Sequence, residues 1–275
     1  MGVIVLDGPM GTELVRRGVA IPTVAWSAAA LNTAPDVVAS IHRDYASAGA
    51  VVHTANTFRT KQRNVGASWE ALTRLAVRIA RESVPAAHRV AGSIAPLEDC
   101  YRPDRSPGEA SRGEHADLAR ALADAGVDLI LCETFAQAAE AQAAVRESVR
   151  TGSETWVALT AGPDASLLTP QAMRDAARAC AGEGASVVLV NCTPAAQTLR
   201  YLDALAGVGV PFGAYANAGR AEERIGWGAD SRAGATTYAR LARTWLDAGA
   251  TVIGGCCGTG PAHIASLSAL AKDFS

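Results

Sequence analysis

A short unit recurs at four places along this chain: a helix-like stretch, a glycine, a short apolar run, and then polar residues. The glycines of the four units are Gly49, Gly126, Gly184 and Gly249. Glycine adopts the left-handed conformation that commonly ends a helix, and the apolar run after each one suits a strand buried on both faces. Because helices and strands alternate, the repeat predicts an α/β protein with a parallel sheet.

The segments between these units extend the alternation over the whole chain. Strands are predicted near 3–6, 50–54, 89–94, 127–132, 155–160, 186–190, 211–215 and 250–254, and helices near 35–48, 69–83, 113–125, 136–149, 170–181, 195–205, 234–248 and 261–271. This count and spacing favour a single-domain (β/α)₈ TIM barrel over residues 1–275, with an open doubly wound sheet as the alternative. Two longer loops, 98–111 and 217–233, follow the third and seventh strands, on the face where barrels build their sites.

Composition and charge limit the kinds of partner that the chain can have. Of its 275 residues, 49% are hydrophobic and 19% are charged, which supports a sizeable core and excludes a disordered chain. The net charge is -2 and no dense run of Lys or Arg occurs, so neither nucleic acid nor a membrane surface is expected as a partner. The apolar runs are too short to span a membrane and the first residues lack a signal-peptide pattern, so we expect a cytoplasmic protein with reduced cysteines.

Polar residues gather where the predicted strands end. These residues are Asp7, Thr54, Asn56, Glu133, Thr134, Asn191, Cys192, Asn217, Cys256 and Cys257. Barrel strands are mostly apolar because the helices and the packed interior cover them, so polar residues at their carboxyl ends need an explanation. A barrel brings all of these strand ends to one face, and we therefore expect them to form a site there.

Three of the six cysteines belong to this group: Cys192 after the sixth strand, and Cys256 and Cys257 after the eighth. Three thiolates can hold Zn²⁺ and leave a fourth tetrahedral position open for a substrate. Neighbouring side chains of a strand point in opposite directions, so both sulfurs of the pair reach one metal only if the strand ends there, which the flanking glycines permit. The alternatives are simple burial of the cysteines, or a redox pair between the two neighbours.

Signatures of several common enzyme classes are absent from the sequence. It contains no Gly-x-Ser-x-Gly elbow, Walker loop or His-Glu-x-x-His, which argues against α/β-hydrolases, P-loop NTPases and zincins. The segment 254–260 is rich in glycine like the phosphate loop of some barrels, but its two thiols make a poor phosphate cradle. Cys100, Cys132 and Cys180 have no partner at metal spacing and are interpreted as structural or incidental, whereas His53 lies at a strand end and could face the site.

Five short motifs resemble those of a known enzyme family. They are Asp7-Gly8-Pro9-Met10-Gly11-Thr12, Ala55-Asn56-Thr57-Phe58, Glu133-Thr134-Phe135, Asn191-Cys192 and Gly254-Gly255-Cys256-Cys257-Gly258-Thr259. In this order they resemble the homocysteine S-methyltransferase family, which includes betaine-homocysteine methyltransferase, the S-methylmethionine-dependent enzymes and the homocysteine module of cobalamin-dependent methionine synthase. The motifs cover nearly the whole chain, and as a set they are specific.

The resemblance implies a (β/α)₈ barrel that transfers a methyl group to the sulfur of homocysteine and so makes methionine. It implies that Cys192, Cys256 and Cys257 bind Zn²⁺ and carry the catalysis, with the homocysteine sulfur as a further ligand. By the same resemblance, Asp7 and Glu133 contact the amino group of the substrate, and backbone N–H groups near Gly8 hold its carboxylate. Further candidates for substrate binding are Thr54, Asn56 and Asn217.

The methyl donor is less directly indicated than the acceptor. The chain lacks the long C-terminal arm of the betaine enzymes and any cobalamin module, which favours a sulfonium donor such as S-methylmethionine or S-adenosylmethionine. A sulfonium cation is attracted by aromatic faces, for which Trp26, Phe58, Tyr101, Phe135 and Trp227 are the candidates. The cationic and polar residues Arg59, Lys61, Gln62 and Arg63 either face the donor, which would favour a donor with a carboxylate, or form an ordinary solvated helix start.

Two other functions remain open from the sequence. The same zinc and thiolate chemistry could act on another thiol or on a selenol. Alternatively, the three cysteines could serve a non-catalytic, zinc-holding or redox-sensing barrel, which would leave Asp7 and Glu133 without a purpose. The protein is expected to be a monomer or a small homo-oligomer, with homocysteine and a small methyl donor as its partners.

Overall fold

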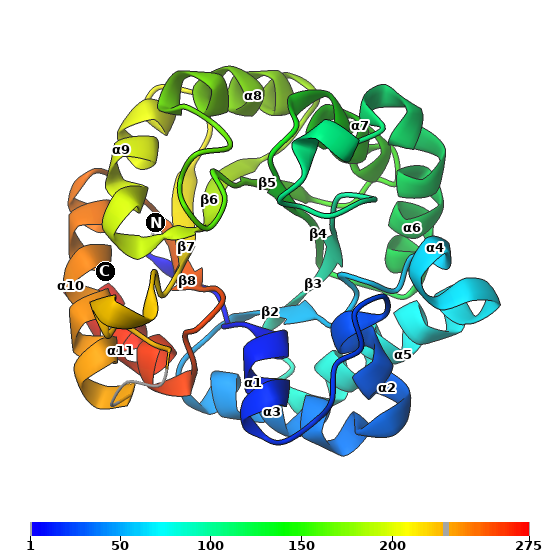
Figure 1. Ribbon diagram of the computed structural model, residues 1–275, viewed down its shortest axis with the longest axis horizontal. Helices are drawn as coiled ribbons and strands as arrows, with labels where there is room; N and C mark the ends of the chain where they lie inside the picture. The colour runs from blue at the N-terminus through cyan, green and yellow to red at the C-terminus, as the bar shows by residue number, and fades with distance from the viewer. Residues whose placement is uncertain (1, 228–230, 275) are drawn as a thin grey trace.

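Eight parallel strands form the sheet of this protein, whose computed structural model describes residues 2–227 and 231–274 (Figure 1). The strands are β1 (Ile4–Val5), β2 (Val52–Ala55), β3 (Arg89–Ile94), β4 (Leu129–Phe135), β5 (Thr155–Leu159), β6 (Val187–Pro194), β7 (Phe212–Asn217) and β8 (Val252–Gly255). Their order in the sheet is β1-β8-β7-β6-β5-β4-β3-β2. The predicted (β/α)₈ barrel is therefore confirmed, and each predicted strand overlaps an observed one.

The two ends of this sheet meet and close the barrel. Leu6 and Val52 form a parallel bridge between the segments of β1 and β2. On either side of it, Val51 N donates to Val5 O at 2.9 Å and Asp7 N donates to Val52 O at 3.0 Å. An open doubly wound sheet would leave these groups unpaired at its edges, so the closure excludes that alternative.

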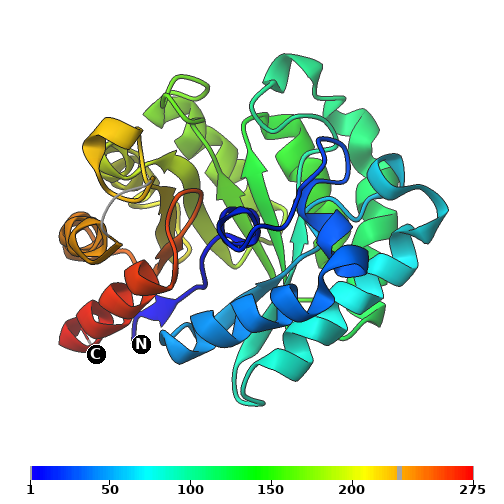
Figure 2. The same ribbon diagram turned by 60° about the horizontal axis from the view of Figure 1, so that its bottom comes forward.

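Eight long helices surround the barrel in the positions that the repeat predicts (Figures 1 and 2). They are α3 (Pro35–Ser47), α5 (Trp69–Ser83), α6 (Arg112–Asp124), α7 (Ala138–Val149), α8 (Pro170–Gly182), α9 (Ala195–Leu205), α10 (Ser231–Asp247) and α11 (Pro261–Ala271). Three short helices were not predicted: α1 (Met10–Arg16), α2 (Ala30–Thr33) and α4 (Gln62–Val65). All three lie in the loops after β1 and β2, on the face where the strands end. No helix among the described residues has the length and apolar character needed to cross a membrane.

The repeated glycines end their helices as predicted. Gly49, Gly126, Gly184 and Gly249 have φ angles of +99°, +80°, +106° and +98°. After α3, Gly49 N donates to Ala46 O at 3.0 Å and Ala50 N donates to Tyr45 O at 3.1 Å, which satisfies carbonyl groups that the helix end would leave free. Each glycine therefore turns the chain from a helix directly into the next buried strand.

The core consists of two layers of buried side chains. The larger layer fills the space between the barrel and the helices, and the smaller one fills the inside of the barrel. The inner layer contains Leu6, Val52, Leu131, Trp156 and Tyr215, so the barrel is a packed core and has no pore. The space for a cavity therefore lies beyond this inner layer, between the carboxyl ends of the strands and the loops that follow them.

Two strands, β4 and β6, carry an irregularity close to their carboxyl ends. The pairing register shifts between Cys132 and Phe135 on β4, and between Asn191 and Pro194 on β6. Within these bulges Thr134 and Cys192 have φ angles of +67° and +45°, which are unusual for residues other than glycine. Asn191 Nδ2 donates to Thr134 Oγ1 at 2.7 Å and links the two bulges. A bulge redirects the side chains that follow it, so this pair sets the directions of side chains at the mouth of the barrel.

The buried Tyr238 hydroxyl on α10 supports the adjoining ends of β7 and β8. It lies 2.8 Å from the carbonyl oxygens of Ala216 and Gly254 and accepts a hydrogen bond from Ala216 N at 2.9 Å. We expect Tyr238→Phe to lower the free energy of unfolding by about 1–3 kcal/mol, because it removes the hydrogen bonds that this hydroxyl makes to buried backbone groups. Urea denaturation measures this loss. Tyr45→Phe is the control and should lose less, since the Tyr45 hydroxyl makes a single bond of 3.2 Å to Pro9 O; equal losses would contradict the prediction.

Candidate metal and substrate site

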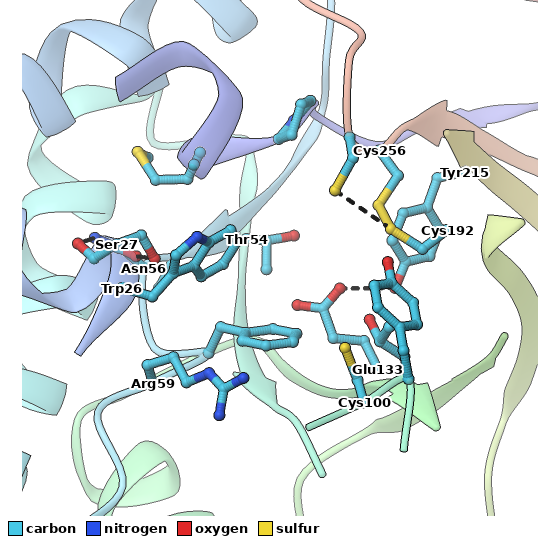
Figure 3. Close-up of a pocket in the computed structure, with 18 of the residues that line it drawn as sticks. Trp26, Ser27, Thr54, Asn56, Arg59, Cys100, Glu133, Cys192, Tyr215 and Cys256 are labelled. Carbon is cyan, nitrogen blue, oxygen red and sulfur yellow. Dashed lines mark hydrogen bonds between the residues drawn. A yellow bond between two sulfur atoms is a disulfide. The ribbon is translucent and has the colours of Figure 1, made fainter. Parts of the chain in front are cut away.

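A cavity of about 620 Å³ opens at the carboxyl ends of the strands (Figure 3). Its walls come from the ends of β4, β6, β7 and β8 and from the loops after β1, β2 and β3. Eight of the nine residues predicted for the site line it: Asp7, Gly8, Thr54, Asn56, Glu133, Cys192, Cys256 and Cys257. The ninth, Asn217, lies behind the wall. The strand ends therefore meet on one face, as the sequence predicts.

The three predicted cysteines converge at one side of this cavity. The sulfur atoms of Cys192, Cys256 and Cys257 all lie within 4.8 Å of one another. Cys192 reaches the cavity from the bulge of β6, and β8 ends at Gly255, immediately before the cysteine pair. Cys256 and Cys257 can therefore both turn toward Cys192, because neither is constrained by the alternation of a strand.

The sulfur atoms are placed for either a disulfide or a shared metal ion. A disulfide joins Cys192 and Cys256, and Cys257 Sγ lies 3.5 Å from Cys192 Sγ. The disulfide thus connects the ends of two strands. The redox pair considered from the sequence was between the neighbours Cys256 and Cys257, and the structure does not form that pair. In a tetrahedral zinc site with Zn–S bonds of about 2.3 Å, two sulfurs lie roughly 3.8 Å apart, which is close to the Cys192–Cys257 spacing. Because a metal needs all three as thiolates, the disulfide-bonded and metal-bound forms exclude each other.

Hydrogen bonds from behind the wall hold the cysteine-bearing segments. Asn217 Nδ2 donates to Cys192 O at 2.8 Å, and Asn217 Oδ1 accepts from Gly219 N at 2.8 Å. The Arg16 guanidinium on α1 donates to Gly258 O at 2.8 Å and to Thr259 O at 2.7 Å, just beyond the cysteine pair. Asn217 therefore positions Cys192, and the structure gives its side chain no direct contact with the cavity.

Two buried carboxylates face the cavity beside the cysteines. Asp7 accepts hydrogen bonds from Thr54 N at 2.8 Å and Thr54 Oγ1 at 3.1 Å. Glu133 accepts from the hydroxyls of Ser93 and Tyr215, the latter at 2.9 Å. No cation of the described residues forms an ion pair with either carboxylate. This pair is suited to bind a cationic group of a ligand, for which charge-assisted hydrogen bonds would be strong.

Burial sets the protonation of these two carboxylates. It raises the pKa of Asp7 to about 8, although the two hydrogen bonds from Thr54 lower it, and nearby Glu133 raises it further. Burial also raises the pKa of Glu133, against the effect of the bonds from Ser93 and Tyr215. A bound cation would favour the ionised form of both groups, so its binding should release protons near neutral pH.

Gly8 must lack a side chain because the Tyr45 ring occupies the space that one would need. A Cβ atom at this position would lie 2.6 Å from the Tyr45 ring, which is fully buried against the loop after β1. Gly8 also lines the cavity, so its backbone borders the cavity directly. Asn56 is tied to Ser27, accepting from its hydroxyl at 2.6 Å and donating to its carbonyl oxygen at 2.8 Å. It therefore holds the wall segment that bears Trp26.

Only some of the aromatic residues considered for binding the methyl donor line the cavity. Trp26, Phe58 and Tyr101 line the cavity, and the Trp26 and Phe58 rings meet edge to face with centroids 5.5 Å apart. Phe135 was wrongly placed among the candidates, because it is fully buried and packs against His115. Trp227 is also outside the lining: its indole N–H donates to Gly219 O at 2.8 Å on the surface of the loop after β7.

Several other predictions about single residues are corrected. Lys61 is buried and donates to the carbonyl oxygens of Ala95 and Pro96, so it does not face a donor. His53 does not line the cavity and stacks on His88 behind it. Cys100, interpreted as structural or incidental from the sequence, lines the cavity on the loop after β3. The direction of a side chain in a loop depends on tertiary packing, and no local pattern in these segments indicates it.

A second group of possible metal ligands consists of Asp7 and two histidines behind the cavity wall. Atoms of Asp7, His42 and His53 all lie within 4.8 Å of one another, and all three residues are buried. Burial lowers the pKa of His42 to about 3 and that of His53 to about 4, so both are neutral at pH 7. Neither histidine borders the cavity. The sulfur cluster, in contrast, is open to a ligand there.

The sequence did not indicate the residues that support the site by hydrogen bonds to its side chains and backbone. Ser93 and Tyr215 bond to Glu133, and Arg16 holds the segment after the cysteine pair. Ser93 and Tyr215 lie on strands β3 and β7, where a polar atom within an apolar run is the only available signal. Arg16 gives no such signal, because a charged residue on a short helix is usually solvated.

We expect Asp7→Asn to change how stability depends on pH. The pKa of Asp7 rises from an ordinary value of 3.8 to about 8 on folding, so the unfolded chain loses the proton first. Wild-type stability therefore falls as the pH rises from about 4 to about 8, and levels off above that range. The melting temperature of the variant minus that of the wild type should increase across this range, in thermal melts of reduced, metal-free protein. The exposed Asp117→Asn is the control, and a difference independent of pH would contradict the prediction.

Comparison with known proteins assigns this architecture to a family. The family model for homocysteine S-methyltransferase matches residues 4–271. Homocysteine S-methyltransferase of Escherichia coli K12 is 31% identical over 97% of this chain and 94% of its own, and selenocysteine Se-methyltransferase of Brassica oleracea var. italica is 26% identical over 97% and 88%. The metallated form of the homocysteine methyltransferase MmuM from Escherichia coli has a similar structure, with a TM-score of 0.82 and 29% identity over 98% of this chain and 96% of that chain. This chain belongs to the homocysteine S-methyltransferase family.

Proposed function

We propose that this protein transfers a methyl group from a small sulfonium donor to the thiolate of homocysteine and so produces methionine, using Zn²⁺ held by Cys192, Cys256 and Cys257. The observation that carries the proposal is the cluster of three cysteine sulfurs within 4.8 Å at the wall of a 620 Å³ cavity. Three thiolates leave one tetrahedral position of zinc open, which is where the acceptor sulfur would bind. A structural relative has a metallated form, which supports metal binding by this protein.

The carboxylates beside the cysteines give the acceptor its orientation. Asp7 and Glu133 would receive the ammonium group of homocysteine, since both are buried and have no cation of their own among the described residues. The backbone around Gly8, bare because of the Tyr45 ring, would receive the carboxylate. An acceptor held at both ends of its amino acid part would present its sulfur to the cysteines, and a simple thiol without an ammonium would bind poorly.

The reaction is a direct transfer between two sulfur atoms. When bound, zinc would favour the thiolate of the acceptor over its thiol and leave it able to attack a methyl group. The new bond joins the acceptor sulfur to the methyl carbon, and the bond from that carbon to the donor sulfur breaks. Its electron pair stays on the donor, which leaves as a neutral thioether, and the thiol proton passes to solvent. No covalent bond to the protein is needed.

The aromatic residues on the opposite wall suit a cationic donor. Trp26 and Phe58 form one edge-to-face pair there, and Tyr101 lies on the neighbouring loop. Aromatic faces attract cations through the negative charge of the ring face, and the attraction is stronger when water is excluded. A sulfonium group held between this wall and the cysteines would direct its methyl group toward the acceptor.

A selenol acceptor is the second candidate. A relative at 26% identity is a selenocysteine Se-methyltransferase. Asp7 and Glu133 would address the amino acid part of an acceptor, and this part is common to homocysteine and selenocysteine. Selenocysteine therefore belongs in any panel of acceptors, and the non-catalytic redox barrel predicts transfer to neither.

We expect the reduced protein to bind one zinc ion per chain. Cys256→Ser should lose it, because a serine hydroxyl is a much weaker zinc ligand than a thiolate. Metal analysis after gel filtration measures the zinc content of both proteins. Cys100→Ala is the matched control and should keep the metal, since Cys100 lines the same cavity outside the sulfur cluster. A reduced wild-type protein without zinc would disprove the metal site.

We expect methionine to form from homocysteine and one of four donors: S-methylmethionine, S-adenosylmethionine, betaine or methyltetrahydrofolate. Mass spectrometry of the product identifies the donor, and Cys256→Ser should abolish the product. Glu133→Gln should raise the KM for homocysteine about 10- to 100-fold, because it removes a charge-assisted hydrogen bond to the ammonium group. If zinc binds but no donor yields methionine, the acceptor is another thiol or selenol, and the proposal for homocysteine is wrong.

A further inference from the structure

One cation at the cavity has no counterpart among the residues that the structure describes. Arg59 lines the cavity on the loop after β2, and its guanidinium makes no hydrogen bond or ion pair with any residue in the ranges 2–227 and 231–274. Its Nε atom is buried and has no hydrogen-bond partner within these ranges. The guanidinium carbon lies 5.6 Å from the centroid of the Phe58 ring.

Neighbouring cations show how unusual this is. Arg63 also lines the cavity, but it pairs with both Glu98 and Glu114. Lys61 donates to two backbone carbonyl oxygens. A buried guanidinium nitrogen without an acceptor costs free energy, and a charged group costs more than a neutral one. The chain therefore leaves positive charge at one place in the cavity, where it can be balanced by an anionic ligand.

The position of Arg59 separates it from the cysteines proposed to hold the acceptor sulfur. Figure 3 places its guanidinium across the cavity from Cys192 and Cys256, with Glu133 next to Cys100 and nearer to Arg59 than the two cysteines are. Asp7 and Glu133 follow or end the strands β1 and β4, and neither carboxylate forms an ion pair with Arg59 in the described part of the chain. An acceptor whose sulfur reaches the cysteines and whose ammonium reaches these carboxylates would leave Arg59 to the second substrate.

We propose that Arg59 binds the carboxylate of the methyl donor, so that this protein takes sulfonium compounds that carry a carboxylate and discriminates against simple sulfonium ions. The planar guanidinium presents parallel N–H groups that match the two oxygens of a carboxylate. With the carboxylate at Arg59, the sulfonium would lie against Trp26 and Phe58, between the arginine and the cysteines. This inference rests on the proposed function, because it assigns the donor half of the same cavity.

The test compares three methyl donors that differ in their charged groups. Trimethylsulfonium has no carboxylate, dimethylsulfoniopropionate has a carboxylate without an ammonium, and S-methylmethionine has both. With zinc-loaded, reduced protein and saturating homocysteine, Arg59→Gln should raise the KM of the two carboxylate donors about 10- to 100-fold. Transfer from trimethylsulfonium and the KM for homocysteine should both stay within about 3-fold of the wild type.

Two further variants separate this role from a structural one. Arg59→Lys should recover part of the loss, because lysine keeps the charge but not the two parallel donors. Arg74→Gln is the matched control: it removes an exposed arginine on α5 that pairs with Glu70, and should change neither KM. Thermal melts of all variants check that they fold alike.

Three outcomes would overturn the inference. An equal loss with all three donors would make Arg59 structural, a rise in the KM for homocysteine alone would assign it to the acceptor, and unchanged kinetics would give it no role.

A binding experiment tests the inference independently of the proposed reaction. Dimethylsulfoniopropionate is titrated calorimetrically into the protein without homocysteine, so that no methyl transfer is required. Should no donor yield methionine, binding to the wild type that Arg59→Gln loses would still establish the carboxylate subsite, and equal or absent binding would disprove it.

Discussion

The hydrogen-bonded ladder that closes between β1 and β2 determines where every functional side chain of this protein lies. All pairings in the ladder are parallel, so the carboxyl ends of the strands emerge on one face. Asp7 follows the first strand and Cys256 follows the last, yet β1 and β8 pair within this ladder: Leu6 N donates to Ile253 O at 2.8 Å, and Gly255 N donates to Asp7 O at 3.1 Å. The same ladder explains why the two ends of the chain lie close together in Figures 1 and 2.

Two kinds of group in the cavity lack a partner of opposite charge within the described chain. Asp7 and Glu133 have no cation, and Arg59 has no anion. The carboxylates match an ammonium group of a ligand, the arginine matches a carboxylate, and the three cysteine sulfurs beside them are close enough to share a thiophilic ion. Groups of this kind reduce the stability of the folded protein, because burial without a partner is unfavourable. The unpaired charges of the cavity therefore lower the stability of the folded protein and, at the same time, provide groups that a ligand can bind.

The surrounding structure offsets this instability with hydrogen bonds to the backbone. Tyr238 joins the ends of β7 and β8, Arg16 holds the segment after the cysteine pair, and Asn217 holds the carbonyl of Cys192. The left-handed conformation of Cys192 is maintained within the linked bulges of β4 and β6. Such a conformation in a residue other than glycine persists only where its surroundings determine it. The site is thus held by residues that never contact a substrate.

The sequence by itself determined the repeating architecture and the type of chemistry. Helix ends at Gly49 or Gly249, buried strands and polar strand ends depend on residues close together in the chain, and the family motifs named Asp7, Glu133 and the three cysteines in advance. The tertiary structure decided which of the other candidates face the cavity: Arg59 and Cys100 do, whereas Phe135, Trp227 and Lys61 do not. It also decided that Cys192 meets Cys256 in a disulfide and that Ser93 and Tyr215 support Glu133. The reason is that these contacts depend on the register between strands and on the two bulges, which arise from packing between distant segments and leave no periodic trace in the local sequence.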